Sequence, residues 1–251
     1  IFIGSLSDFI RLYPEVAKEH YGRIASVETD ALVALNTLFA AEGFVVYVPR
    51  GAKMPGHIEL RSILPSRAGH ISVERALIIV DVQPTFCEGG ELPVEGGNAV
   101  ARRVAEHVAA HRGDYALVAT TQDWHIDPGA HFSDEPDFVD TWPRHGVAGT
   151  PGAMLHPALD GLAADITVKK GQYAAAYSGF EGTTEDGRAL AEALRGAGVT
   201  DVDVVGLALS HCVCETALDA LREGFGVRVV EGLTAPVSPE LGEAAKERMR
   251  S

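Results

Sequence analysis

The sequence has 251 residues with 46% hydrophobic and 22% charged side chains, which is typical of a globular protein with a sizeable buried core. Its net charge of −14 lies entirely in residues 76–251, because residues 1–75 carry equal numbers of acidic and basic groups, and this argues against nucleic acid or an anionic membrane as a partner. No apolar run is long enough to span a membrane, no secretory signal is visible, and three cysteines make no disulfide framework, so we expect a cytoplasmic protein.

The first part of the chain predicts a small α+β extension, residues 1–61, followed by a linker over residues 62–73. Residues 5–21 predict one or two short helices interrupted near Pro14, residues 31–41 a further helix, and residues 44–48 a strand. The segment ALVALNTLFAAEGFVVYVPRGAKMPGHIEL resembles a short piece of the Suf-type iron–sulfur cluster assembly scaffold. Because the later coils of that scaffold are absent, the resemblance does not extend iron–sulfur assembly to this chain. The role of this extension is left open.

From Glu74 onward, strand and helix patterns alternate. Strands are predicted over residues 76–80, 115–121, 165–168, 202–209 and 227–230, and helices over residues 98–112, 184–198, 212–224 and 238–250. This alternation predicts a three-layer α/β/α fold with a mostly parallel central sheet. In such sheets, binding and catalytic sites form beyond the carboxyl ends of the strands.

Cys212 lies where a buried strand turns into a helix. The N-terminus of a helix lowers the pKa of a thiol, so Cys212 is a candidate nucleophile. A cysteine at such a junction is, however, more often a small buried hydrophobic residue. Cys214 could form half of a metal site with it, but only Cys87 remains to complete that site, which makes the interpretation weak.

Four potential metal ligands follow one another in a long segment with little periodicity. Asp123, His125, His131 and His145 have the spacing D-x-H-x5-H-x13-H. One carboxylate and three imidazoles suit a first-row transition metal and leave positions for water or a ligand. Surface loops also contain histidine by chance, but the clustering here favours a built site.

Two further charged residues lie at predicted strand ends. Asp81 follows an apolar strand, where an unpaired carboxylate would be costly, and Lys170 is a possible partner. The alternative for Asp81 is to cap the following turn. Since side chains alternate along a strand, we expect one of Lys169 and Lys170 to point to solvent.

With these residues in place, residues 74–250 resemble nicotinamidases of the isochorismatase-like cysteine hydrolase family. The resemblance is carried in order by ALIIVDVQPTFCEGGELPVEGG, TTQDWHIDPGAHFS, WPRHGVAGTPGA, KGQYAAAYSGFEG and VVGLALSHCVCETALDA. It implies that Asp81 is the general acid and base, Lys170 the cation beside it and Cys212 the nucleophile. It also implies that Asp123, His125, His131 and His145 hold one divalent transition metal ion, such as zinc, iron or manganese.

The same resemblance implies a substrate wall and an oxyanion hole. The wall would consist of Phe86, Trp142, Tyr177, Leu207 and Ala208, with a cis peptide bond between the last two. The backbone N–H groups of Ala208 and Cys212 would form the oxyanion hole. The implied reaction is hydrolysis of nicotinamide, and of pyrazinamide-type analogues, to the acid and ammonia through a thioester on Cys212.

The sequence departs from the family pattern at two points. Pro84-Thr85 replaces the usual acidic or amide pair, which affects the entrance of the pocket. The sequence stops at Arg250-Ser251, where relatives continue into a final edge strand. We therefore expect the hydrolase domain, residues 74–251, to lack its last edge strand or to have that edge covered by residues 1–60.

Other functions are compatible with the same residues. A carbamoyl or ureido amidohydrolase of the superfamily would keep Asp81, Lys170 and Cys212 without needing the histidine site. A non-catalytic binding or scaffold protein would keep the fold alone. The sequence leaves open whether the chain forms a homo-oligomer, and the partner that it implies is the small molecule nicotinamide.

Overall fold

The computed structural model describes residues 1–20, 44–51 and 74–250. The chain divides into two compact units, Ile1–Ala68 and Gly69–Ser251. The helix predicted over residues 31–41 and the linker over residues 62–73 lie outside the described residues. Among the helices that the structure describes, none has both the length and the apolar character needed to cross a membrane.

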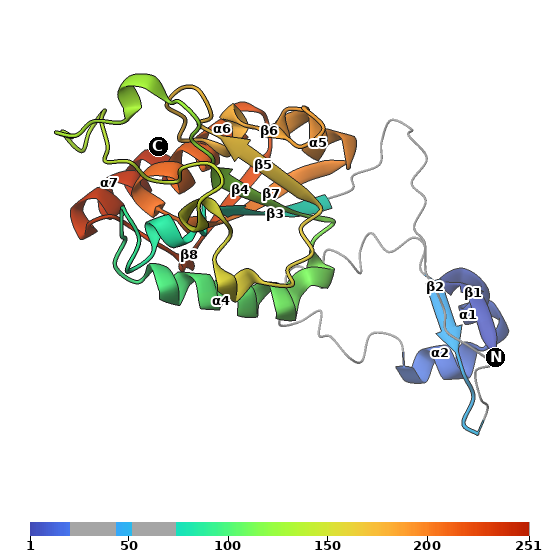
Figure 1. The fold of residues 1–251 in the computed structure, drawn as a ribbon. Coiled ribbons are helices and arrows are strands. Elements are labelled where there is room, and N and C mark those ends of the chain that lie inside the picture. Colours follow the sequence, from blue (N-terminus) through green and yellow to red (C-terminus); the bar gives the residue numbers. More distant parts are fainter. Residues whose placement is uncertain (21–43, 52–73, 251) are drawn as a thin grey trace. The chain divides into compact units, whose positions relative to one another are not determined.

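In its described residues, 1–20 and 44–51, the N-terminal unit has a two-stranded antiparallel sheet and two short helices (Figure 1). Its elements are β1 (Phe2–Ser5), α1 (Leu6–Leu12), α2 (Pro14–His20) and β2 (Phe44–Tyr47). Residues 5–21 were predicted to form one or two short helices, and the structure has two. They separate at Tyr13 because the residue before a proline disfavours helical dihedrals. Strand β1 was not predicted. The rings of Phe2, Phe9, Tyr13 and Tyr47 contact one another, with centroid separations between 5.3 and 5.8 Å.

The larger unit has the predicted three-layer α/β/α architecture around a six-stranded sheet of order β6-β5-β4-β3-β7-β8. Only β6 runs antiparallel to its neighbour. The elements are β3 (Glu74–Val80), α4 (Gly97–His111), β4 (Leu117–Asp123), β5 (Ile166–Lys170), β6 (Thr183–Thr184), α5 (Leu190–Gly196), β7 (Val199–Leu207), α6 (Cys214–Arg222), β8 (Gly226–Ala235) and α7 (Pro239–Arg250).

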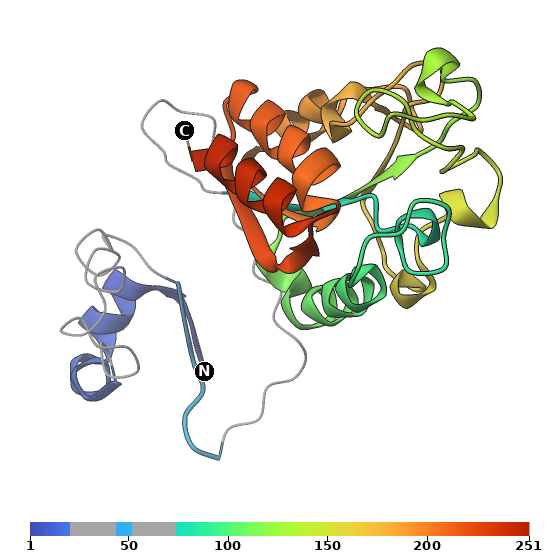
Figure 2. The same ribbon diagram turned by 90° about the vertical axis from the view of Figure 1, so that its left-hand side faces the viewer.

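Side-chain alternation along β3 supplies both faces of the sheet with core residues. Ile78 packs in the cluster that contains Leu194 of α5 and Ala217 of α6, whereas Ile79 packs in the cluster that contains Val100 and Val104 of α4. Helix α4 therefore covers one face, while α5 and α6 cover the other (Figures 1 and 2). Burial on both faces explains why β3 is apolar at every position from Ala76 to Val80.

The helix predicted over residues 184–198 is shorter in the structure, where it begins only at Leu190. Thr184 belongs instead to β6, and its hydroxyl accepts a hydrogen bond from the backbone N–H of Arg188 at 2.9 Å. Gly187 has a φ of 82°, which is a left-handed conformation that a helix cannot contain. This turn ends β6, so the helix begins only at Leu190.

A buried carboxylate ties β7 to its neighbours on the α4 face of the sheet. Asp203 is 0% exposed, and its oxygens accept hydrogen bonds from Arg75 at 2.6 Å, from Tyr115 at 3.0 Å and from Arg228 Nε at 3.0 Å. Burial alone would raise the pKa of Asp203, but these donors outweigh burial and lower the pKa below its usual value. The ionised carboxylate therefore stabilises the fold.

We expect Asp203→Asn to reduce the free energy of unfolding at neutral pH by about 1 to 3 kcal/mol, because two guanidinium groups lose their charged acceptor. Since the pKa is depressed in the folded state, this stabilisation is present above the unfolded pKa and is lost as pH falls through the folded pKa. Urea unfolding of wild type and variant should thus give a difference that shrinks below about pH 4. Asp201→Asn, at the more exposed partner of Arg75, is the matched control. A difference that does not depend on pH would contradict this account.

Candidate active site

Four functional side chains predicted from the sequence meet at the carboxyl edge of the sheet. Asp81 follows β3, Asp123 ends β4, Lys170 ends β5, and Cys212 follows β7. Because β3, β4, β5 and β7 are parallel neighbours, their ends bring these residues together. Asp81 itself has a φ of 46°, a left-handed conformation that is uncommon for a residue with a side chain and that costs backbone energy.

Lys170 is the centre of this cluster. Its ammonium nitrogen lies 2.9 Å from Asp81 Oδ2, forms an ion pair with Asp123 Oδ1, and lies 3.7 Å from Cys212 Sγ. It also donates to the carbonyl oxygen of Ala176 at 3.2 Å. The side chain is 1% exposed, so a lysine is buried here only because two carboxylates surround it. Lys169 lies instead over the ring of Trp124, at 4.1 Å from its centroid.

The charges in this cluster are set by burial and by Lys170. Burial would lower the pKa of Lys170, but Asp123 and Asp81 outweigh burial and raise it well above its usual value. Burial would raise the pKa of Asp123, but the charge of Lys170 outweighs burial and holds the pKa well below its usual range. For Asp81, burial prevails and raises the pKa, although Lys170 opposes it. Lys170 and Asp123 are therefore charged at neutral pH.

The prediction that a helix N-terminus lowers the pKa of Cys212 is wrong. Cys212 lies in a π-helical turn, Leu209–Val213, and its thiol is buried. Burial raises the pKa of this thiol well above its ordinary value, and Asp81 and Asp123 add to the effect, while Lys170 opposes it. The thiol is therefore protonated at rest, and a base is needed to make it a nucleophile.

Asp81 has the geometry of such a base. Its Oδ1 accepts a hydrogen bond from the hydroxyl of Thr121 at 2.6 Å, and its backbone N–H donates to the same residue. Its Oδ2 forms the ion pair with Lys170 at 2.9 Å and has a second lone pair that no described donor uses. A buried carboxylate oxygen with an unused lone pair and a raised pKa is suited to accept a proton.

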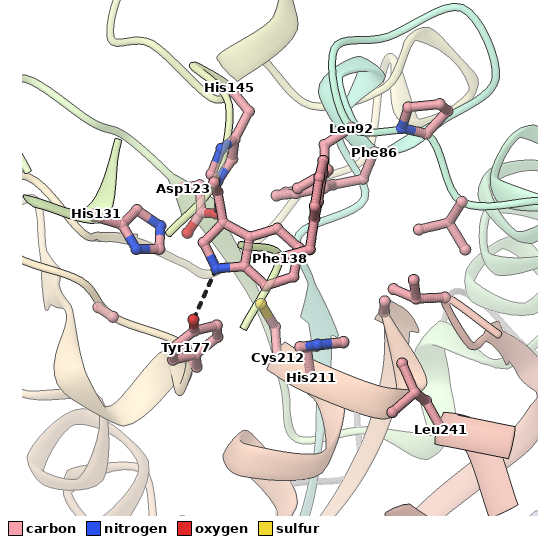
Figure 3. Close-up of a pocket in the computed structure, with 16 residues that line it drawn as sticks. Phe86, Leu92, Asp123, His131, Phe138, His145, Tyr177, His211, Cys212 and Leu241 are labelled. Carbon is pink, nitrogen blue, oxygen red and sulfur yellow. Dashed lines mark hydrogen bonds and ion pairs between the residues drawn. The ribbon is translucent and has the colours of Figure 1, made fainter. Parts of the chain in front are cut away.

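Three of the predicted metal ligands converge beside this cluster, and Figure 3 shows two of them, His131 and His145. His125, His131 and His145 are buried, and one nitrogen from each lies within 4.8 Å of the others. His125 Nδ1 donates to the carbonyl of Gly171 at 2.6 Å and His145 Nδ1 to that of Pro143 at 2.7 Å. A carbonyl only accepts, so both Nε2 atoms carry a free lone pair.

The chemistry of these donors fits a divalent transition metal. His125 Nε2 and His131 Nδ1 are buried without hydrogen-bond partners, as expected of nitrogens that bind an ion. Burial and the neighbouring imidazoles of His125 and His145 lower the pKa of His131 to about 4, so it is neutral at pH 7. Asp123 Oδ2 lies 3.5 Å from His125 Nε2 and 3.6 Å from His145 Nε2, which places this carboxylate beside the triad.

Gln83 holds Asp123 in place, and the sequence did not single it out. Its side-chain amide is fully buried, donates to the carbonyl oxygens of Asp123 and Ala153 at 3.0 and 2.8 Å, and accepts from the Asp123 N–H at 2.9 Å. It thereby fixes the backbone of a residue that faces Lys170 and the histidines at once. Gln122, which precedes Asp123 in β4, donates from its side-chain amide to the carbonyl of Ala153 at 2.7 Å.

We expect Gln83→Leu to weaken metal binding by about 10- to 100-fold, because the side chain that fixes Asp123 is lost. Titration of the metal-free protein with zinc, followed by equilibrium dialysis, measures this change without relying on activity. Gln122→Leu removes a buried amide of the same size and is the matched control, with a smaller effect on zinc affinity. Equal zinc affinities for the two variants would contradict the role of Gln83.

The predicted aromatic wall surrounds a cavity of about 390 Å³ that reaches Cys212. Phe86, Trp142, Tyr177 and Ala208 line this cavity, and the indole N–H of Trp142 donates to the hydroxyl of Tyr177 at 2.9 Å (Figure 3). Leu207 is not among the described lining residues, because its side chain is fully buried in the α4-side core. The peptide bond between Leu207 and Ala208 is cis, as expected from the resemblance.

Several lining residues were not predicted. The His211 ring meets the Trp142 ring edge-on, with centroids 5.5 Å apart, and its centroid lies 6.4 Å from that of the Tyr177 ring. Its position next to Cys212 in the sequence was a signal that could have identified it. Residues of two distant segments, 92–94 and 237–241, also line the cavity, and nothing local in the sequence indicates that they meet.

The fold and this cluster define a cysteine-centred site at the carboxyl edge of a parallel α/β sheet. Comparison with known proteins agrees with that class: the family model of the Isochorismatase domain matches residues 75–251. A nicotinamidase/pyrazinamidase of Mycobacterium tuberculosis is 54% identical over 177 residues, which cover 70% of this chain and 95% of that protein. The chain belongs to the isochorismatase domain family.

Solved structures show the same relationship. A pyrazinamidase of Pyrococcus horikoshii in complex with zinc is 38% identical with a TM-score of 0.61, over 70% of this chain and 94% of that one. A protein of L. infantum in complex with nicotinate is 31% identical with a TM-score of 0.61, over 72% and 91% of the two chains.

The N-terminal region has a different relationship, which agrees with the resemblance noted in the sequence. The family model of the SufBD protein N-terminal region matches residues 1–60. An iron–sulfur cluster assembly SufBD family protein of Synechocystis is 27% identical over 128 residues, which cover 50% of this chain. The aligned part spans only about a quarter of that relative, 26% of its length.

Proposed function

We propose that this chain hydrolyses nicotinamide to nicotinate and ammonia through a thioester on Cys212. The observation that carries the proposal is the contact of one buried lysine, Lys170, with two carboxylates and the thiol, beside three converging imidazoles. The similarity to nicotinamidases over the whole hydrolase unit supports nicotinamide, and pyrazinamide-type analogues, as the substrate class.

The proposed chemistry follows from the protonation states. Asp81 accepts the proton of the Cys212 thiol, and the sulfur attacks the carboxamide carbon. Lys170 stabilises the negative charge shared by Asp81 and Cys212, and the N–H groups of Ala208 and Cys212 face the oxyanion. Protonated Asp81 then delivers its proton to the departing nitrogen as the C–N bond breaks, which releases ammonia.

The second half of the reaction uses the same residues. Water gives a proton to Asp81 as it attacks the thioester carbon. The C–S bond then breaks to release nicotinate, and Asp81 returns the proton to the sulfur, which restores the thiol. A zinc, iron or manganese ion held by His125, His131, His145 and Asp123 would bind the pyridine nitrogen and orient the ring. Phe86, Trp142 and Tyr177 would enclose the ring in the cavity.

The test is an assay of ammonia and nicotinate released from nicotinamide, with metal analysis of the same protein sample. We expect equal amounts of both products, strong loss of activity after chelation, and recovery on adding back a divalent metal ion. Activity that persists after complete metal removal would favour a carbamoyl- or ureido-type amidohydrolase instead. Binding of nicotinamide without any product would favour a non-catalytic binding protein.

A further inference from the structure

Apolar side chains from two segments that are distant in the sequence also line the cavity. Leu92, Pro93, Val94, Val237 and Leu241 line it. In Figure 3, Leu241 and His131 lie on opposite sides of Cys212. We call these five residues the apolar rim. Leu241 and Val237 are 46% and 44% exposed, so the rim opens to solvent.

The rim is held in place by the residues that build the site. The backbone N–H of Leu92 donates to the Thr85 carbonyl at 2.9 Å, and that of Val94 donates to the Phe86 carbonyl at 3.1 Å. On the other side, the N–H of Val237 donates to the hydroxyl of Ser210 at 3.1 Å. These bonds connect both segments of the rim to the neighbours of the aromatic wall and of Cys212, so the apolar surface is part of the site.

The rim offers a ligand no charge and no side-chain hydrogen bond. All five of its side chains are hydrocarbon, and the titratable residues described in the lining are Asp123, His131, His145, Tyr177, His211 and Cys212. Among these, His211 already has a partner, because its Nδ1 pairs with the hydroxyl of Ser210 at 2.9 Å. A substrate group that enters the rim is therefore stabilised by burial of its apolar surface.

The proposed function identifies the part of the substrate that would enter the rim, and this inference rests on that proposed function. With the ring nitrogen toward the histidines and the acyl carbon at Cys212, the bond that breaks points away from the histidines. The group attached there is the leaving group, and ammonia is too small to reach the rim. A longer leaving group would extend toward Leu241, across Cys212 from His131.

We propose that this chain also hydrolyses esters of nicotinate whose alcohol portion is a short unbranched alkyl chain. Sγ of Cys212 forms a bond to the acyl carbon, and the C–O bond to the alcohol breaks. The proton that Asp81 took from the thiol goes to the departing oxygen, which leaves as the alcohol. Water then cleaves the thioester as in the amide reaction, so no further reactant is needed.

The experiment compares kcat/KM for the methyl, n-butyl and 2-methoxyethyl esters of nicotinate, with Cys212→Ala as the baseline for uncatalysed hydrolysis. The butyl and methoxyethyl groups have the same length, but the second carries an ether oxygen. We expect the butyl ester to exceed the methyl ester about tenfold, because its additional methylene groups are partly buried, and to exceed the methoxyethyl ester as well. A butyl ester that is no better than the methyl ester would overturn the proposal.

Two variants test whether the preference for the butyl ester arises at the apolar rim. Leu241→Asn should reduce the ratio of butyl to methyl kcat/KM severalfold, since it places an amide in the rim. Leu221→Asn, at an equally exposed leucine of α6 outside this cavity, should leave the ratio unchanged. An unchanged ratio in Leu241→Asn would also count against the proposal.

The nicotinamide assay on the same preparation separates the two proposals. If nicotinamide is hydrolysed but the butyl ester shows no preference, only the proposal for the rim fails. If nicotinamide is not hydrolysed, the proposed function fails whatever the esters show.

Discussion

Replacing Cys212 by alanine is expected to reduce ammonia release from nicotinamide by at least about a thousandfold. The proposed reaction forms its covalent bond at this sulfur, and no other described cysteine reaches the cavity. The substitution removes one buried sulfur atom and no charge, because the thiol is protonated at rest. The variant should therefore fold, and nicotinamide should still bind to it.

Cys214→Ala is the matched control. Cys214 is also buried and outside any disulfide, but it packs against α7, where its sulfur lies 3.9 Å from the carbonyl oxygen of Ala245. We expect its kcat for nicotinamide to stay close to that of wild type. Similar losses in both variants would mean that packing, and not the nucleophile, was disturbed. Activity that survives in Cys212→Ala would exclude the thioester.

Replacing Lys170 by methionine is expected to lower both the stability of the protein and its kcat for nicotinamide. Asp81 and Asp123 would lose the cation between them, and breaking a buried ion pair in this manner costs about 3 kcal/mol or more of stability. The pKa of Asp81, which burial already raises, would rise further without Lys170. Asp81 would then hold a proton and could not accept one from Cys212, so we expect kcat to fall by about 100- to 10,000-fold.

Lys169→Met tests whether this loss is specific to the buried lysine. Lys169 is the preceding residue on β5, and its ammonium lies over Trp124 instead of in the cluster. We expect thermal unfolding and kcat of this variant to change little. A Lys170→Met protein with wild-type kcat would show that Asp81 does not need the cation to act as a base.

The sequence was sufficient for the arrangement of the layers. The apolar run from Ala76 to Val80 in β3 predicted a central parallel strand. Asp81, Asp123, Lys170 and Cys212 each ended or followed a strand, which is why their meeting could be expected. The helix over residues 184–198 was predicted too long, because the turn at Gly187 depends on its φ and on the hydroxyl of Thr184, which no hydrophobic periodicity reveals.

The electrostatic properties of the site could not be predicted from the sequence. The position of Cys212 at a strand–helix junction indicated a lowered thiol pKa, but burial next to two carboxylates raises it. That outcome depends on contacts between residues far apart in the chain. Gln83 was overlooked for the same reason, since its amide spans β4 and the turn at Ala153. The apolar rim likewise joins two segments that are distant in sequence.

The most direct test of the account is to hydrolyse nicotinamide in the presence of hydroxylamine and to measure ammonia, nicotinate and nicotinohydroxamate together. A thioester on Cys212 is open to hydroxylamine as well as to water. The account predicts that nicotinohydroxamate forms at the expense of nicotinate, that the two acyl products together equal the ammonia, and that Cys212→Ala forms neither. Ammonia accompanied by nicotinate alone, at every hydroxylamine concentration, would contradict a covalent intermediate on this cysteine.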